Sequence, residues 1–180
     1  MDLLIMANQK PSPVDYGFGG HVGWVVSGII SGIAGSMAFG AILGLFYPNV
    51  ISVTIPSLYG LEPGGSLGFW LHLLHGLILG VIYAFVVTRE LVLRILVLNT
   101  NSASNLGPNT RLILAGAIYG LAVWIAIPLL ALPVWTSITG STDPAFPTAT
   151  VGSLAGHFIF GVTLGFLFSI LVRIPEKFGG

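Results

Sequence analysis

The stretch of sequence that decides the fold is His72-Leu-Leu-His75-Gly76-Leu-Ile-Leu-Gly80. It lies within a segment, Gly68 to Thr88, that contains no Lys, Arg, Asp or Glu. A helix needs about 20 consecutive, largely apolar residues to cross the ~30 Å hydrocarbon core of a bilayer. The segment meets that requirement, so it is predicted to be a membrane-spanning helix with histidine and glycine at regular positions.

The same pattern returns 85 residues later as His157-Phe-Ile-Phe-Gly161-Val-Thr-Leu-Gly165, so both copies read His-x-x-x-Gly-x-x-x-Gly. The likeness extends into the preceding helices, where a shift of 88 residues aligns Gly28 to Ala34 with Gly116 to Ala122. We interpret the chain as two tandem two-helix repeats, residues 21–88 and 112–172. Because each repeat crosses the membrane twice, the repeats have parallel topology, related by an axis along the membrane normal.

The composition identifies lipid as the main solvent. Hydrophobic residues make up 54% of the chain and charged residues only 7%, whereas a soluble domain carries about 25% charged residues. The net charge is zero and no basic cluster is present, so a nucleic-acid partner is not expected. The chain has no cysteine, which excludes disulfides, thiolate catalysis and cysteine-ligated metals.

The predicted fold is an all-α integral membrane protein with four transmembrane helices. We expect the spans at about residues 21–46, 66–87, 112–135 and 152–172. An interfacial arm (residues 1–20), a polar connection (residues 89–111) and a short tail (residues 173–180) complete the chain. Pro128 and Pro133 are expected to kink or end the third span, because proline lacks a backbone N–H.

The cations predict the orientation. Cytoplasmic loops of membrane proteins are enriched in Lys and Arg. All six such residues fall in the arm, the polar connection or the tail, whereas the proline-bearing connections 47–65 and 136–151 have none. We therefore expect both termini on the cytoplasmic side of the cell membrane and both proline-bearing connections outside. The six cations are Lys10, Arg89, Arg94, Arg111, Arg173 and Lys177.

Small residues at four-residue spacing predict how the helices pack. Such stripes form grooves that let two backbones approach closely, and they are typical of right-handed helix crossings in membranes. A tight bundle accounts for most of these glycines, although a cofactor or a pore would use the same grooves. The predicted packing positions are Gly28, Gly32, Gly40, Gly44, Gly76, Gly80, Gly116, Gly120, Gly161 and Gly165.

The histidines are the main candidates for chemistry. An imidazole within a span usually faces the bundle and has a partner. One interpretation of His72 and His157 is a hydrogen bond between helices; the other is axial ligation of haem b, with the glycines leaving room for the porphyrin. His75 is a further candidate contact, but its counterpart in the second repeat is Phe160, so no second ligand pair exists.

Other motifs argue against an enzyme. The outer connections carry one carboxylate each, Glu62 and Asp143, without the spacing of metal ligands. No Lys, Arg, Asp or Glu lies within a predicted span, which disfavours an ion-coupled transporter. Nucleophile elbows, His-Glu-x-x-His and phosphate loops are absent from the sequence. We predict no catalytic residue and no metal site.

One part of the chain consists of the string Ile55-Pro-Ser-Leu-Tyr-Gly-Leu-Glu-Pro-Gly-Gly-Ser66, followed by Trp70-Leu-His72-Leu-Leu-His75-Gly76. This part resembles a group of small, uncharacterised four-span archaeal membrane proteins. In that group a Pro-x-Leu-Tyr-Gly-Leu connection leads into a Trp-x-x-His-x-x-His-Gly helix, with a second, degenerate copy. This chain differs in having one residue between Trp70 and His72. The resemblance covers the repeat core and implies no activity.

Three function classes follow from these observations. The first is a non-catalytic accessory or structural subunit of a larger membrane complex, such as a respiratory or other redox assembly. The second is a membrane cytochrome that binds haem b through His72 and His157. The third is a channel or carrier for small solutes. The first is preferred, with the lipid bilayer, other membrane subunits and a second copy of the chain as expected partners.

Overall fold

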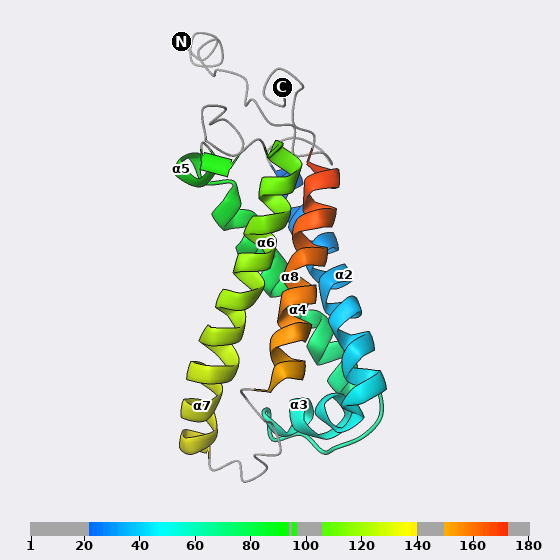
Figure 1. Cartoon of the computed structure of the whole chain (residues 1–180). Coiled ribbons are helices and arrows are strands. Elements are labelled where there is room, and N and C mark those ends of the chain that lie inside the picture. Colours follow the sequence, from blue (N-terminus) through cyan, green and yellow to red (C-terminus); the bar gives the residue numbers. More distant parts are fainter. Residues whose placement is uncertain (1–21, 94, 97–105, 140–149, 173–180) are drawn as a thin grey trace, which may run out of the picture.

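The computed structural model describes residues 22–93, 95–96, 106–139 and 150–172, and the regular structure of these residues is helical throughout (Figure 1). Four helices are long and apolar enough to cross a membrane: α2 (Gly23–Phe46), α4 (Leu67–Val87), a third spanning Pro108–Thr139, and α8 (Val151–Leu171). The predicted all-α, multi-pass membrane protein is therefore confirmed. The arm 1–20, the tail 173–180 and Asp143 lie outside the described residues.

The third span differs from its prediction. It runs from Pro108 to Thr139 instead of from 112 to 135, as α6 (Pro108–Trp124), the π-helical segment η4 (Ile125–Ala131) and α7 (Leu132–Thr139) in succession. Pro128 does not end the helix, because it lies within η4, where the wider turn accommodates a residue without an N–H. Residues 136–139 consequently belong to the helix and not to the outer connection.

The four spans form an open ring in the order α4, α2, α8, third span. Helix α2 packs closely against both α4 and α8, and α6 packs closely against α8, whereas α4 and α6 make few contacts. Two tyrosines join α4 to α6: the Tyr83 hydroxyl donates to the Leu112 oxygen (2.7 Å) and the Tyr119 hydroxyl to the Leu79 oxygen (2.8 Å). The gap between α4 and α6 is thus bridged by tyrosine side chains in one part of the bundle and is not bridged in another part.

The two ends of the bundle have different structures (Figure 1). At one end, which we call the α3 end, the connection after α2 folds into the π-helical η2 (Val50–Thr54) and α3 (Ile55–Ser57). It packs on the start of α4, where the Ile51 carbonyl lies against Gly68. The other, α5 end holds α5 (Glu90–Leu93), the start of α2 and the end of α8.

Glycines lie where the paired helices approach most closely. A Cβ atom on Gly32 of α2 would lie 2.8 Å from the Cα of Gly80 in α4, and one on Gly116 of α6 would lie 2.8 Å from the Cα of Gly165 in α8. Because a real Cβ needs more than 3 Å, only glycine permits these distances. Gly44 differs from the packing prediction, since no described atom lies within 4 Å of its would-be Cβ.

The two helix pairs cross in different registers. A Cβ on Gly32 would approach the Cα of Gly80, whereas one on Gly120, its counterpart in the sequence, would approach the Cα of Gly161 at 3.0 Å. The shift from Gly80 to Gly161 is 81 residues, four fewer than the 85 of the sequence alignment, which is one helical turn. His72 and His157 therefore occupy different positions relative to the crossings, although their sequence motifs match.

Candidate functional site

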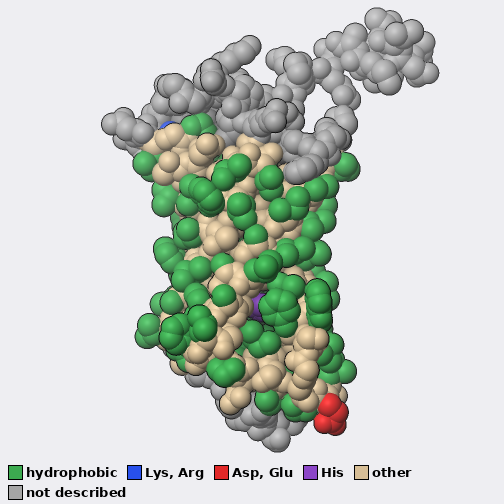
Figure 2. Space-filling view, turned by 90° about the vertical axis from the view of Figure 1, so that its right-hand side faces the viewer, with side chains coloured by type: hydrophobic (Ala, Val, Ile, Leu, Met, Phe, Trp, Pro, Cys, Tyr) green, Lys and Arg blue, Asp and Glu red, His purple; other side chains and the backbone are tan. Residues whose placement is uncertain are grey.

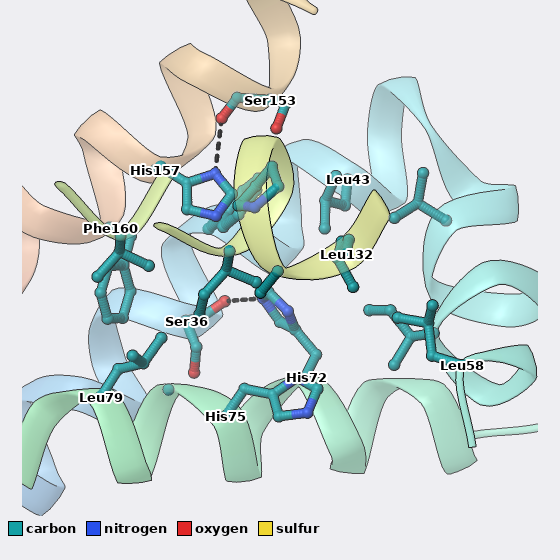
Figure 3. A pocket seen from close by; sticks show the side chains of 18 of the residues that line it. Ser36, Leu43, Leu58, His72, His75, Leu79, Leu132, Ser153, His157 and Phe160 are labelled. Carbon is teal, nitrogen blue, oxygen red and sulfur yellow. Dashed lines mark hydrogen bonds between the residues drawn. The ribbon is translucent and has the colours of Figure 1, made fainter. Parts of the chain in front are cut away.

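A cavity of about 570 Å³ lies between the helices, in the half of the bundle toward the α3 end (Figure 3). Its walls come from α2, α4, the third span and α8, and residues of the η2–α3 connection also contribute. Most of the lining side chains are apolar, and three imidazoles are among the rest. They are His72 and His75 of α4 and His157 of α8.

His72 connects two helices. Its Nε2 donates to the backbone oxygen of Ser36 in α2, at 2.9 Å, and the side chain is buried. Gly40 lets the ring fit, because a Cβ there would lie 3.2 Å from the imidazole Cδ2. The arrangement is the interhelical bond that was one of the two interpretations of this residue.

His157 is bonded within its own helix. Its Nδ1 donates to the backbone oxygen of Ser153, four residues earlier in α8, at 2.8 Å (Figure 3). Among the described residues Nε2 has no hydrogen-bond partner, and the residue lines the cavity. Ser153 lines the same cavity and is itself buried, and its hydroxyl oxygen is also without a partner among the described residues.

His75 closes the cavity toward the α3 end. Its Nε2 is hydrogen-bonded to the Tyr59 hydroxyl, and the two rings are stacked with centroids 5.8 Å apart. Beside them the Trp135 indole N–H donates to the Leu58 oxygen (2.9 Å), which ties the third span to the connection. The connection thus lies over the α3 end of the cavity. It is attached to α4 by the bond of Tyr59 to His75 and to the third span by the bond of Trp135.

Phe39 of α2 contacts both of the candidate haem ligands. Its ring centroid is 5.4 Å from that of His72 and 4.8 Å from that of His157. Bis-histidine ligation requires both imidazoles to present a free nitrogen to iron from opposite faces of one porphyrin. In this arrangement the His72 Nε2 is bonded to Ser36 and the Phe39 ring packs against both imidazoles, so the haem interpretation needs Phe39 to move.

The cavity opens sideways between α4 and the third span. Ile78 and Ile82 of α4 and Ile127 of η4 line it and are also exposed on the outer surface. Figure 2 shows another side of the bundle, the α2 side: hydrophobic side chains are spread over it, an imidazole is visible among them, and the coloured charged side chains lie only near the ends. Because the exposed residues beside the opening are aliphatic and belong to membrane-spanning helices, the opening leads from the cavity into the bilayer.

The predicted site residues are thus partly brought together. His72, His75 and His157 line one cavity, whereas Glu62 is not among its lining residues. No group of three His, Cys, Asp or Glu that could hold a metal ion occurs within residues 22–93, 95–96, 106–139 and 150–172. Sequence reasoning did not identify Phe39 or Tyr59 as neighbours of the histidines, since no motif connects them, whereas Ser153 lies four residues before His157 in the stripe of small residues.

Comparison with known proteins adds a partial likeness. The model of a family of unknown function (DUF6789) matches residues 96–178, which is somewhat less than half of the chain. The chain is therefore similar to that family over the third and fourth spans. No curated protein matches the chain, and no solved structure matches it.

Proposed function

We propose that this protein is a non-catalytic subunit of a larger membrane assembly, and that it binds a small apolar molecule from the bilayer in the cavity between α4 and the third span. The observation that carries the proposal is the cavity itself. Its volume, about 570 Å³, falls within the ~300–1,000 Å³ typical of small-molecule sites, which are mostly apolar with a few polar groups.

The lining supports a lipid-soluble ligand over a polar one. Val123, Ile127 and Leu132 of the third span face Ile78 and Ile82 of α4 across the cavity. A solute that is polar over its whole surface would lose its hydration and find only the few polar groups near the histidines, and each polar group left without a hydrogen bond costs several kcal/mol. This environment disfavours the alternative of a channel or carrier for small polar solutes.

The surface at the α3 end supports a role within an assembly. Ile138 and Val151 are 76 and 82% exposed, and both lie near helix ends on that side. Helix ends at this depth meet headgroups or water, where exposed aliphatic side chains are unfavourable. A neighbouring subunit that covers this end would bury them. A respiratory or other redox assembly remains the candidate that the sequence favours.

The haem alternative retains one supporting observation. The His157 Nδ1 donates to a carbonyl, which leaves Nε2 in the orientation that metal-ligating histidines commonly adopt. His72 lacks that orientation, because its Nε2 is the donating atom. A visible spectrum of the purified protein decides between a haem and a colourless ligand.

The test is purification from the native membrane in mild detergent, followed by a native gel. The protein composition, the visible spectrum and an organic extract are read from one band. We expect co-migration with larger subunits, no haem absorbance and a small apolar molecule in the extract. Migration alone without a small molecule contradicts the proposal, and a haem spectrum that is lost in His72→Ala replaces it with the cytochrome.

A further inference from the structure

We infer that the molecule bound in this cavity presents hydroxyl hydrogen-bond donors to the histidines, as an alkyl hydroquinone does, and is not a ligand with carbonyl oxygens alone. The inference rests on the proposed function and adds to it the chemical class of the ligand. It follows from the direction of two hydrogen bonds.

The first direction is that at His157. A carbonyl oxygen can only accept, so the Nδ1 that contacts the Ser153 oxygen at 2.8 Å must carry the proton. In a neutral imidazole the other nitrogen is then an acceptor. The Nε2 of His157 therefore carries a lone pair that can accept a hydrogen bond. It has no partner in the described part of the chain, and the residue lines the cavity.

The second direction is that at His72, where the roles of the nitrogens are reversed. Nε2 donates to the Ser36 oxygen, so Nδ1 is the acceptor. The Cδ2–Nε2 edge of the ring faces Gly40 of α2, and the opposite edge, which carries Nδ1, is turned away from that helix. No described residue bonds to Nδ1. His72 and His157, from different helices, thus each carry an acceptor nitrogen, and both residues line one cavity.

Ser153 orients His157 through its backbone oxygen (Figure 3). The residue is 8% exposed, and its hydroxyl oxygen is buried without accessible surface, so the hydroxyl is not a contact for a ligand. The groups that a ligand can meet are therefore the imidazole acceptors, and a ligand hydroxyl suits them because an O–H donates to a ring nitrogen.

The cavity has a few polar groups within an apolar lining, which indicates an amphiphile. His72 and His157 lie between Ile55 and Leu58 of the connection and the residues Ile82 and Val123, which extend the lining toward the middle of the bundle. Phe39 presents an aromatic ring beside both imidazoles. A flat ring with hydroxyl groups therefore fits the polar part and an alkyl chain fits the remainder.

The test compares two ligands that differ only in the donors. A decyl-substituted benzohydroquinone and the corresponding benzoquinone are titrated, without oxygen, into the whole chain in lipid nanodiscs. We expect the hydroquinone to bind about tenfold more tightly, because a buried acceptor left without a donor costs on the order of one hydrogen bond. Decanol, titrated in parallel, distinguishes an aromatic diol from any long-chain alcohol, and equal affinity for decanol would overturn the aromatic assignment.

The outcomes separate this inference from the proposed function. Equal binding of hydroquinone and benzoquinone would overturn the donor inference while the cavity remained a binding site. Binding of none of the three ligands would overturn both. In His157→Leu we expect the preference for the hydroquinone to fall toward one, and in Phe158→Leu, an exposed neighbour outside the cavity, we expect it to persist. Should His157→Leu not fold, His157→Phe, which keeps a flat ring without an acceptor nitrogen, gives the same comparison, and an unchanged preference there contradicts the inference.

Discussion

The Nε2 atom of His72 lies 2.9 Å from the backbone oxygen of Ser36 and joins α4 to α2 inside the apolar bundle. This bond fixes the imidazole at the wall of the cavity and determines which of its nitrogens remains an acceptor. The matching histidine of the second sequence motif, His157, instead bonds to its own helix. The two histidines are thus equivalent in sequence but not in structure.

This difference predicts unequal effects on stability. His72→Leu removes a bond between helices, and we expect the free energy of unfolding to fall by about 0.6–1.7 kcal/mol, the range found for interhelical bonds in membranes. His157→Leu removes only a bond within α8 and should cost less. Unfolding in mixed detergent micelles measures both, and a larger loss in His157→Leu would contradict this description.

The glycine crossings predict a matched pair of alanine variants. In Gly32→Ala the new methyl group would lie 2.8 Å from the Cα of Gly80, so α2 and α4 must move apart. We expect a loss of about 1–3 kcal/mol, as for overpacked cores. Gly44→Ala places the same methyl group where no described atom lies within 4 Å, and thermal unfolding should be nearly unchanged. Similar losses in both variants would show that the crossing is elsewhere.

The membrane helices could be predicted from the sequence because they depend on local composition. The bounds of α2, α4 and α8 fall within two residues of the predicted spans 21–46, 66–87 and 152–172. The third span could not be bounded in the same way. Whether a helix ends at Pro128 or continues through a π-helical turn depends on the packing around it, since both satisfy the local rule that proline lacks a donor.

The site was only partly predictable. The histidines stand out in the sequence because polar residues are rare in the spans. The cavity lies between helices that make few contacts, α4 and α6, and the two helix pairs cross one turn apart; neither feature is a property of any single segment. The contact of His75 with Tyr59 likewise depends on how the connection folds over the helix end.

The two tyrosine bonds predict what limits the opening between α4 and α6. Tyr83→Phe combined with Tyr119→Phe removes both bonds that join these helices near the α5 end. Because the chain has no native cysteine, spin labels at Phe85→Cys and Ile118→Cys report their separation. We expect the distance distribution to broaden in the double variant and to stay narrow in Tyr47→Phe. A distribution unchanged by the double variant would mean that backbone packing alone holds the helices.

The orientation is testable with the same cysteine-free background. We predict that Glu62→Cys, in the connection at the α3 end, reacts with a membrane-impermeant maleimide in intact cells. Asn109→Cys, near the start of α6, should react only after permeabilisation, because positively charged segments stay in the cytoplasm. The reverse pattern of labelling would invert the orientation.

Native mass spectrometry of the purified chain, released from its micelle, tests the central claim most directly. We predict a peak heavier than the bare chain by the mass of one small amphiphile. The peak should disappear in Ile82→Trp, whose indole occupies the opening of the cavity, and persist in Ile118→Trp, a control on the lipid-facing surface outside it. A bare chain in all three proteins, or a bound mass that Ile82→Trp leaves in place, would contradict the claim that this cavity is the binding site.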